Sequence, residues 1–170
     1  APNFYNNVPL DLTFMNGAWA TQTKKIIASG QNSSATFTIP FSPTIVIVDL
    51  NDKISDAVTT DTKVLKVVGN NFSLTANGRM QVNVQALIDS AYIHVDHNWV
   101  APDPFKAWNQ HYRLTGHYWM VNGIFPAGFY AKATVTYDGR SNTSGGAGNM
   151  DNNIITATNL EDSIVLLYRR

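Results

Sequence analysis

Short extended runs, repeatedly separated by turn residues, constrain this chain more than any other feature of its sequence. Val8 to Met15 alternates large apolar residues with polar or smaller ones, and Asn16-Gly17 separates this run from a second extended run. Asn-Gly between two such runs predicts a tight hairpin, because a type I′ turn needs two residues that tolerate positive φ. The same signal recurs at Asn77-Gly78, between runs at Phe72 to Ala76 and Met80 to Leu87. The pattern predicts a series of antiparallel hairpins.

Further runs of aromatic and β-branched residues are typical of strands, because such side chains fit a half-buried pleated surface. They lie at Ala18–Ile27, Ala35–Ile39, Thr44–Leu50, Lys63–Val68, Ala91–Val100, Tyr112–Val121, Phe129–Tyr137, Ile154–Ala157 and Ser163–Arg170. We expect Thr44–Leu50 to be the most buried strand of the first half and Asn122-Gly123 to be a turn. Arg140 to Asn153 is small, polar and glycine-rich, which indicates a surface loop.

The many short strands and the lack of an amphipathic helix predict an all-β fold, an immunoglobulin-like antiparallel β-sandwich. The segment Asn51 to Thr62 is polar and acidic, and we expect at most one helical turn in it. It divides the chain into a first β-sandwich segment, residues 1–62, and a second, residues 63–170. One single sandwich over residues 1–170 is the alternative, because all-β domains commonly reach this size.

Composition excludes several classes of function. The chain has 170 residues, with 12 Lys and Arg against 12 Asp and Glu. This neutrality argues against a nucleic-acid surface, which needs a basic patch, and the sequence has no run of Lys or Arg that would suit an anionic membrane. There is no cysteine, so disulfides, thiolate zinc sites and a cysteine nucleophile are excluded. The apolar runs are too short to span a membrane.

All four histidines lie between Ala91 and Gly139, and they are the first candidates for chemistry. His94 and Asp96 point to one face of the expected strand and His97 to the other, so His94 and His97 cannot easily grip one ion. A catalytic zinc needs three converging protein ligands, and only His111 or His117 could arrive from a neighbouring strand. His94 and Asp96 are therefore weak metal candidates, and packed or hydrogen-bonded histidines are the simpler interpretation.

Other constellations carry weaker signals. The runs Asp49-Leu50-Asn51-Asp52 and Asp151-Asn152-Asn153 offer oxygen ligands for calcium but lack EF-hand spacing, and such residues commonly bond their own backbone. A paired carboxylate such as Asp96 and Asp103 could serve a glycosidase, but the sequence does not fix the distance between them. No serine-hydrolase motif or His-Glu-x-x-His zinc motif occurs.

The aromatic residues allow a carbohydrate-stacking platform or, alternatively, a packed core. The set comprises Trp19, Trp99, Trp108, Tyr112, Tyr118 and Trp119. Trp108 is the weak candidate for ligand binding, because it alone falls in a predicted loop, after Pro104. Carbohydrate is a possible partner on this interpretation.

Several stretches carry a family resemblance. VPLDLTFMNG and SATFTIPFSPTIVIVDLNDKISDA resemble the β-rich segment that follows the catalytic domain in M1-family (gluzincin) aminopeptidases. HVDHNWVAPDPFK, YRLTGHYWMVNGIFPAGFYAKATVTYDG and DSIVLLYRR are similar to the C-terminal region of secreted M1-like metallopeptidases of the Bacteroidetes type. The resemblance covers nearly all of residues 8–170.

The resemblance implies a non-catalytic accessory domain that packs against the catalytic domain of a longer protein or spaces it from others. Zinc and the catalytic residues would lie in that preceding domain, so no catalytic or cofactor-binding residue is expected here. The implied partners are neighbouring domains of the same chain, and the implied location is secreted or at the cell surface. A stand-alone adhesion protein and a carbohydrate-binding module are the alternatives.

Overall fold

Nine β-strands and no helix occur in the part of the chain that the computed structural model describes, namely residues 5–54, 56–69, 71–74, 77–102, 114–136 and residue 151. The prediction of an all-β fold is therefore confirmed. The strands are β1 (Val8–Met15), β2 (Thr21–Ala28), β3 (Ile45–Val48), β4 (Val58–Leu65), β5 (Asn71–Leu74), β6 (Met80–Ala86), β7 (Ala91–Asn98), β8 (Tyr118–Ile124) and β9 (Tyr130–Val135). Within the described ranges, no helix has the length and apolar character that crossing a membrane requires.

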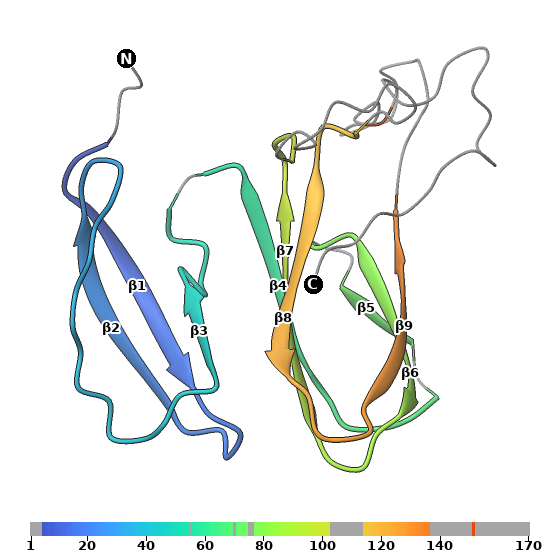
Figure 1. The fold of residues 1–170 in the computed structure, drawn as a ribbon. Helices are drawn as coiled ribbons and strands as arrows, with labels where there is room; N and C mark the ends of the chain where they lie inside the picture. Colours follow the sequence, from blue (N-terminus) through green and yellow to red (C-terminus); the bar gives the residue numbers. More distant parts are fainter. Residues whose placement is uncertain are drawn as a thin grey trace, which may run out of the picture.

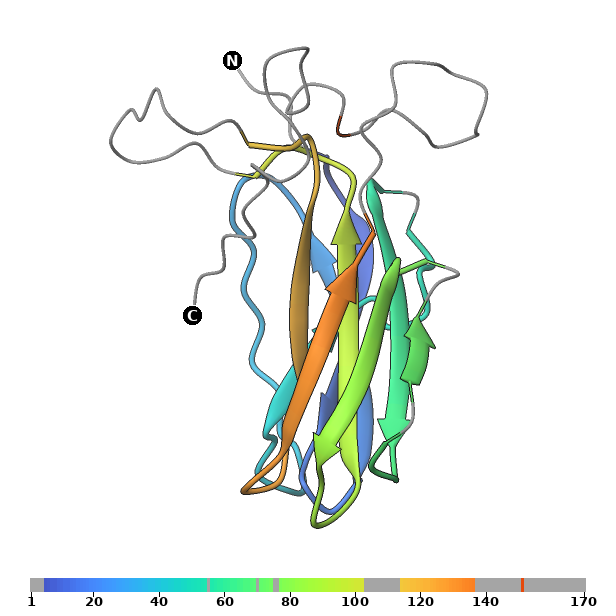
Figure 2. The same ribbon diagram turned by 90° about the vertical axis from the view of Figure 1, so that its right-hand side faces the viewer.

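The strands form three antiparallel sheets of three strands each, stacked as layers (Figure 1). The first sheet has the order β2-β1-β3, the middle sheet β4-β7-β8, and the last sheet β5-β6-β9. The strands of the three layers run in nearly the same direction (Figure 2), as in aligned sheet packing. The predicted antiparallel sandwich is confirmed, and it has three layers.

Strand β7 is the centre of the middle sheet and is buried on both faces. Ala91, Ile93 and Val95 pack into the larger apolar cluster together with residues of the last sheet. Tyr92 points the other way and packs with Met15 and Ile47 of the first sheet. Successive side chains of a strand point to opposite faces, so this one strand contributes to both interlayer cores.

The boundary expected between residues 62 and 63 falls inside β4. All eight residues of β4 pair with β7, from Val58 opposite Asn98 to Leu65 opposite Ala91. The expected polar link therefore ends earlier, since its last five residues form part of a strand. A division of the chain into two sandwich segments remains a prediction.

The two Asn-Gly turns are present, but neither has the predicted type I′ geometry. Positive φ falls instead on Trp19 (66°), two residues after Gly17, and on Arg79 (47°), directly after Gly78. The Asn16 side chain stabilises the first turn, since its Oδ1 accepts hydrogen bonds from the backbone N–H groups of Ala18 and Ala20, each at 3.0 Å.

Three other local predictions are wrong. Asn122-Gly123 lies inside β8, where a Cβ on Gly123 would come within 2.2 Å of the Tyr92 carbonyl oxygen, so the glycine permits close approach of two backbones. Residues 35–39 form no strand, although Phe37 packs edge-on against Phe14. β3 is not deeply buried, since only Ile47 is buried and its neighbours are exposed.

The remaining sequence predictions lie outside the described residues. They are the start of the strand at 112–121, the loop at 140–153 apart from Asp151, and the strands at 154–157 and 163–170.

Candidate functional site

The chemistry-bearing residues gather at one end of β7, on both of its faces. His94 and Asp96 share the face that bears Tyr92, whereas His97 shares the face of Ile93 and Val95. The predicted separation of His94 from His97 is confirmed. Two polar groups result, one on each side of the middle sheet.

The first group is a chain of hydrogen bonds that we call the histidine relay, formed by His97, His117 and Asp151. The Nε2 atom of His97 lies 2.6 Å from Nδ1 of His117, and Nε2 of His117 lies 2.7 Å from Oδ1 of Asp151. The Thr115 hydroxyl donates to the same Asp151 oxygen at 2.5 Å. The three relay side chains are 0–3% exposed, so the relay is sealed from solvent.

Two tryptophans enclose the relay. The Trp119 ring stacks on the His97 ring at an interplanar angle of 7°, and the Trp99 ring also contacts His97, with ring centroids 4.0 Å apart. Trp119 Nε1 donates to the Gly78 carbonyl at 2.7 Å, and Trp99 Nε1 donates to the Thr59 hydroxyl at 2.8 Å. Both rings are fixed by packing and by a hydrogen bond.

Side chains of β4 hold the turn at Asn77 and Gly78, whose Gly78 carbonyl accepts the hydrogen bond from Trp119. Asp61 Oδ2 accepts hydrogen bonds from the backbone N–H groups of Asn77 (3.1 Å) and Gly78 (2.7 Å). The Thr59 hydroxyl donates to the Asn77 carbonyl at 2.9 Å. The Arg79 guanidinium lies 5.0 Å from the centroid of the Trp99 ring, which places a cation near the relay.

Burial and neighbouring charge disfavour the protonated form of His97. Burial, together with the charges of His117 and Arg79, lowers the pKa of His97 to about 4. The Asn77 carbonyl and the Asp151 carboxylate oppose this effect but do not outweigh it. His97 is therefore neutral at physiological pH.

The second group lies on the opposite face of β7. His94 Nε2 contacts Asp96 Oδ1 at 2.9 Å, and the Thr60 hydroxyl donates to the same oxygen at 2.9 Å. Burial raises the pKa of Asp96, but the hydrogen bonds from His94 and Thr60 and the charge of His94 hold this pKa below its usual range. On the same face, burial raises the pKa of the Tyr92 hydroxyl.

Neither group has the geometry of a metal centre. His94 and Asp96 supply two ligands, and the described residues contain no set of three His, Cys, Asp or Glu side chains placed to hold one ion. The relay is a line, because His117 uses opposite ring nitrogens for His97 and Asp151. Metal sites need ligands that converge on one point.

Of the acidic residues predicted as possible calcium ligands, Asp151 is held in the relay, and Asp49 and Asp52 bond the backbone. Asp49 Oδ2 accepts from the Ile54 N–H at 2.7 Å, and Asp52 Oδ2 accepts from the Thr60 N–H at 3.2 Å. These contacts support the interpretation as loop-stabilising residues. Asn152, Asn153 and Asp103 lie outside the described residues.

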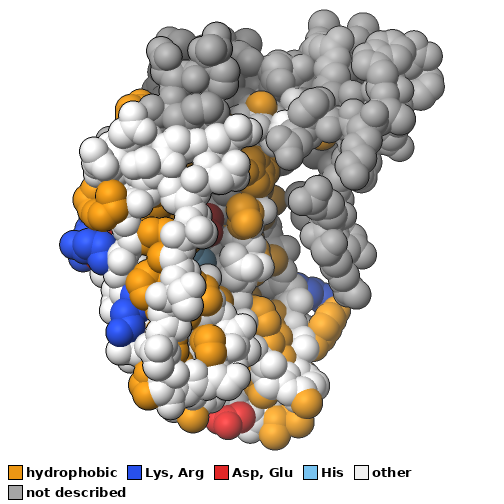
Figure 3. Space-filling model, turned by 60° about the vertical axis from the view of Figure 1, so that its left-hand side comes forward, with side chains coloured by type: hydrophobic (Ala, Val, Ile, Leu, Met, Phe, Trp, Pro, Cys, Tyr) orange, Lys and Arg blue, Asp and Glu red, His pale blue; other side chains and the backbone are white. Residues whose placement is uncertain are grey.

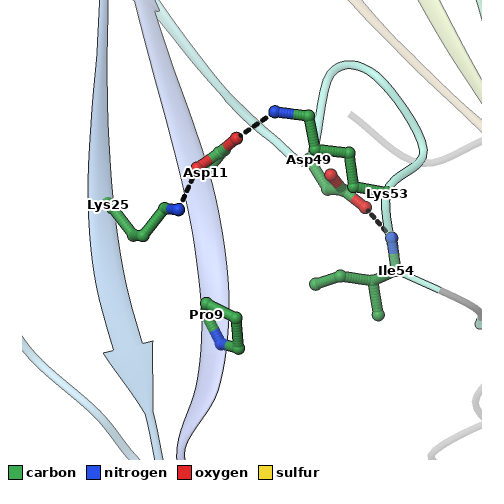
Figure 4. Close-up of a pocket in the computed structure, with 6 residues that line it drawn as sticks. All are labelled: Pro9, Asp11, Lys25, Asp49, Lys53 and Ile54. Atoms are coloured by element: carbon green, nitrogen blue, oxygen red, sulfur yellow. Dashed lines mark hydrogen bonds and ion pairs between the residues drawn. The ribbon is translucent and has the colours of Figure 1, made fainter.

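A pocket of about 300 Å³ lies between the first sheet and the loop after β3 (Figure 4), lined by Pro9, Asp11, Lys25, Asp49, Lys53 and Ile54. Lys53 Nζ lies 2.7 Å from Asp11 Oδ2, and Lys25 Nζ lies 4.0 Å from Asp11 Oδ1. The hydrogen bond from Lys53 lowers the pKa of Asp11, and the same contact raises the pKa of Lys53. The charged groups of this pocket are thus largely directed at one another.

The predicted aromatic platform is only partly described. Trp108 and Tyr112 lie outside the described residues. Trp99 and Trp119 are committed to the relay, whereas Trp19 is 38% exposed and contacts the edge of the Tyr92 ring. Carbohydrate binding remains a prediction.

A feature that the sequence did not reveal is a set of exposed apolar side chains at the other end of the molecule. Val67 (47% exposed), Val68 (51%), Ile88 (83%) and Phe125 (42%) lie on the loops β4–β5, β6–β7 and β8–β9, which form the lower end in Figure 1. We call these four residues the loop end. Figure 3 shows hydrophobic side chains at the lower end of the molecule beside an acidic side chain. Apolar residues are uncommon in turns. The sequence signals for the loop end were therefore apolar residues next to turn residues, namely Val67 and Val68 beside Gly69, and Ile88 beside Asp89.

Comparison with known protein families, with curated proteins and with solved structures gave no match. The resemblance to M1 metallopeptidases therefore remains a prediction.

Proposed function

We propose that this chain is a non-catalytic β-sandwich module that packs against a neighbouring domain of the same protein through its loop end. The observation that carries this proposal is the concentration of exposed apolar side chains on three neighbouring loops. Scattered exposed apolar residues are normal on a protein surface, whereas a group of them at one end is typical of an interaction site.

The loops are close enough to act together. Gly69 N–H donates to the Val84 carbonyl at 2.9 Å, which anchors the β4–β5 loop on β6. The Ile88 Cδ1 atom lies 3.4 Å from the position of a Cβ on Gly128, so the β6–β7 and β8–β9 loops touch. Phe125 and Phe129 stack with ring centroids 4.9 Å apart, which fixes the third loop.

The buried state of the histidines supports the non-catalytic part of the proposal. A general base must reach the proton that it abstracts. His94, His97 and His117 are all buried, and their described hydrogen-bonding contacts are to protein groups. Burial and hydrogen bonds to protein groups support a structural role for these side chains.

The family resemblance gives this proposal its finer form. The parent would be a secreted M1-like zinc metallopeptidase, with zinc in its catalytic domain and this module as an accessory domain. Interfaces between domains of one chain are usually modest in area and fairly polar, which fits four apolar side chains among polar loops.

Photo-cross-linking tests the proposal. Benzoylphenylalanine is placed at position 88 in the protein expressed from its natural reading frame, and cross-linked peptides are identified by mass spectrometry. Position 27 on β2 is the matched control, because Ile27 is also an exposed isoleucine but lies far along the chain from the loop end.

We expect position 88 to cross-link to a peptide outside residues 1–170 of the same polypeptide, and position 27 not to do so. Equal cross-linking from both positions, or cross-links from position 88 only to a second copy of these residues, would contradict the proposal. Hydrolysis of aminoacyl substrates by residues 1–170 alone would overturn its non-catalytic part.

A further inference from the structure

The directions of the hydrogen bonds in the relay follow from its geometry. The Asp151 carboxylate accepts the N–H at Nε2 of His117. In a neutral His117 the other nitrogen, Nδ1, is then an acceptor, so Nε2 of His97 must donate to it. This assignment leaves Nδ1 of His97 as a buried lone pair, and that atom makes no hydrogen bond among the described residues. The Asn77 backbone lies close enough to the His97 ring to raise its pKa.

One added proton changes these directions without breaking a contact. His117 then donates from both nitrogens, to Asp151 and to His97. His97 moves its own proton to Nδ1, where the Asn77 carbonyl can accept it. The added positive charge lies on His117, beside the Asp151 carboxylate. Each ring nitrogen of the two histidines then has a hydrogen-bond partner.

A second added proton is incompatible with the relay. His97 and His117 would both be imidazolium, and each would present an N–H across the 2.6 Å contact with no lone pair between them. The described charged groups that face His97 are His117, Arg79 and Asp151, so two of the three are cationic in this state. The contact between the two rings would have to open.

We propose that the histidine relay is an acid-sensitive lock that joins the end of β7, the start of β8 and Asp151 at neutral pH and comes apart when acid adds a second proton to it. The lowered pKa of His97, about 4, agrees with this geometry. An unfolded histidine titrates near pH 6.5, so between pH 6.5 and pH 4 the unfolded chain binds more protons at this residue than the folded chain. His97 therefore favours the folded state above pH 6.5, and this contribution is lost as pH falls towards 4.

Denaturant unfolding of three proteins across pH 7.5 to 4.0 tests the lock. They are the wild type, His97→Gln and His94→Gln. Glutamine at position 97 can still donate to Nδ1 of His117 but cannot be protonated. His94 is the matched control, because it is an equally buried histidine on the same strand that lies outside the relay.

We expect the urea midpoint of the wild type and of His94→Gln to fall steeply below pH 6.5, and the midpoint of His97→Gln to lose at least half of that pH dependence. The readout is the slope of the urea midpoint against pH. If His97 had a merely structural role, His97→Gln would lower the midpoint by the same amount at every pH and would leave this slope unchanged. The same slope in all three proteins would overturn the proposal.

If His97→Gln does not fold, nitrogen-15 NMR of the wild-type imidazoles decides the question. We expect His97 to stay neutral from pH 7 to pH 5 while the chain is folded. An ordinary midpoint near pH 6.5 for His97, with the fold intact below it, would overturn the lock.

Discussion

The eight residues of β7 alternate between the two faces of the middle sheet, and the two faces pack in different ways. The face towards the last sheet is apolar from Ala91 to Val95 and closes with His97, which is held in the relay. The face towards the first sheet is apolar only at Tyr92 and then becomes polar at His94 and Asp96. The first face therefore carries the main core, and the second carries a smaller contact between layers.

The comparison shows that a polar residue in a strand buried on both faces needs a hydrogen-bond partner inside the protein. A buried polar side chain is costly unless it is hydrogen-bonded, so each histidine needs a partner from another element. His94 finds Asp96 two residues along its own strand, whereas His97 needs His117 and Asp151 from distant parts of the chain.

The largest expected effect compares the two cores directly. Leu65→Ala removes a fully buried side chain from the larger cluster, and Ile47→Ala removes one from the smaller cluster. We expect Leu65→Ala to lower the free energy of unfolding by about 4 kcal/mol and Ile47→Ala by about 2 kcal/mol, within the range of such truncations. Urea denaturation measures both, and a larger loss for Ile47→Ala would reverse the assignment of the main core.

The next loss of stability, smaller than that of Leu65→Ala, is expected on β8, whose two faces border the same two interlayer spaces. Trp119→Ala removes the ring that stacks on His97 and its hydrogen bond to the Gly78 carbonyl. Because Trp119 is only partly buried, we expect a loss of about 3 kcal/mol, at the low end for this type of truncation.

Met120→Ala is the matched change on the opposite face of β8, where the side chain is about half exposed. We expect a loss of less than about 1 kcal/mol for it. Equal losses for the two variants in thermal or urea unfolding would show that Trp119 does not belong to the core.

The smallest effect is expected at the charged pocket beside the first sheet. Lys53→Gln removes the 2.7 Å ion pair with Asp11, but the Lys53 side chain is largely exposed, and ion pairs with an exposed partner contribute little. We expect no resolvable change in the urea midpoint at pH 7. Loss of Lys53 should raise the pKa of Asp11 towards its ordinary value, which an NMR titration of the carboxyl group measures. An unchanged Asp11 titration would contradict the ion pair.

The strands that sequence predicted best are those whose pattern is local. β1, β6, β7 and β9 lie within two residues of the expected runs at each end, because their alternation alone specifies which side chains are buried. Residues 35–39 have the same kind of pattern but no strand, since a strand also needs a hydrogen-bonded neighbour, which no local pattern reports. Gly123 failed as a turn for a related reason: its role depends on the approach of Tyr92 from another strand.

The candidate site was predictable only in part. The pairing of His94 with Asp96 follows from a spacing of two residues on one strand. The relay joins residues that are 20 and 34 positions apart, so it depends on the register of β7 and β8 and on the placement of Asp151. The loop end was not predicted, because its apolar residues lie in turns, where apolar residues are not expected.

Hydrogen exchange of the backbone amides tests the central claim most directly, namely that β7 is the doubly buried centre of a three-layer sandwich. Amides that open only with global unfolding exchange slowest, and these belong to the best-packed strands. We predict that residues 92–97 at neutral pH exchange more slowly than those of β2, which has a single paired neighbour. Faster or equal exchange in β7 would contradict the three-layer arrangement.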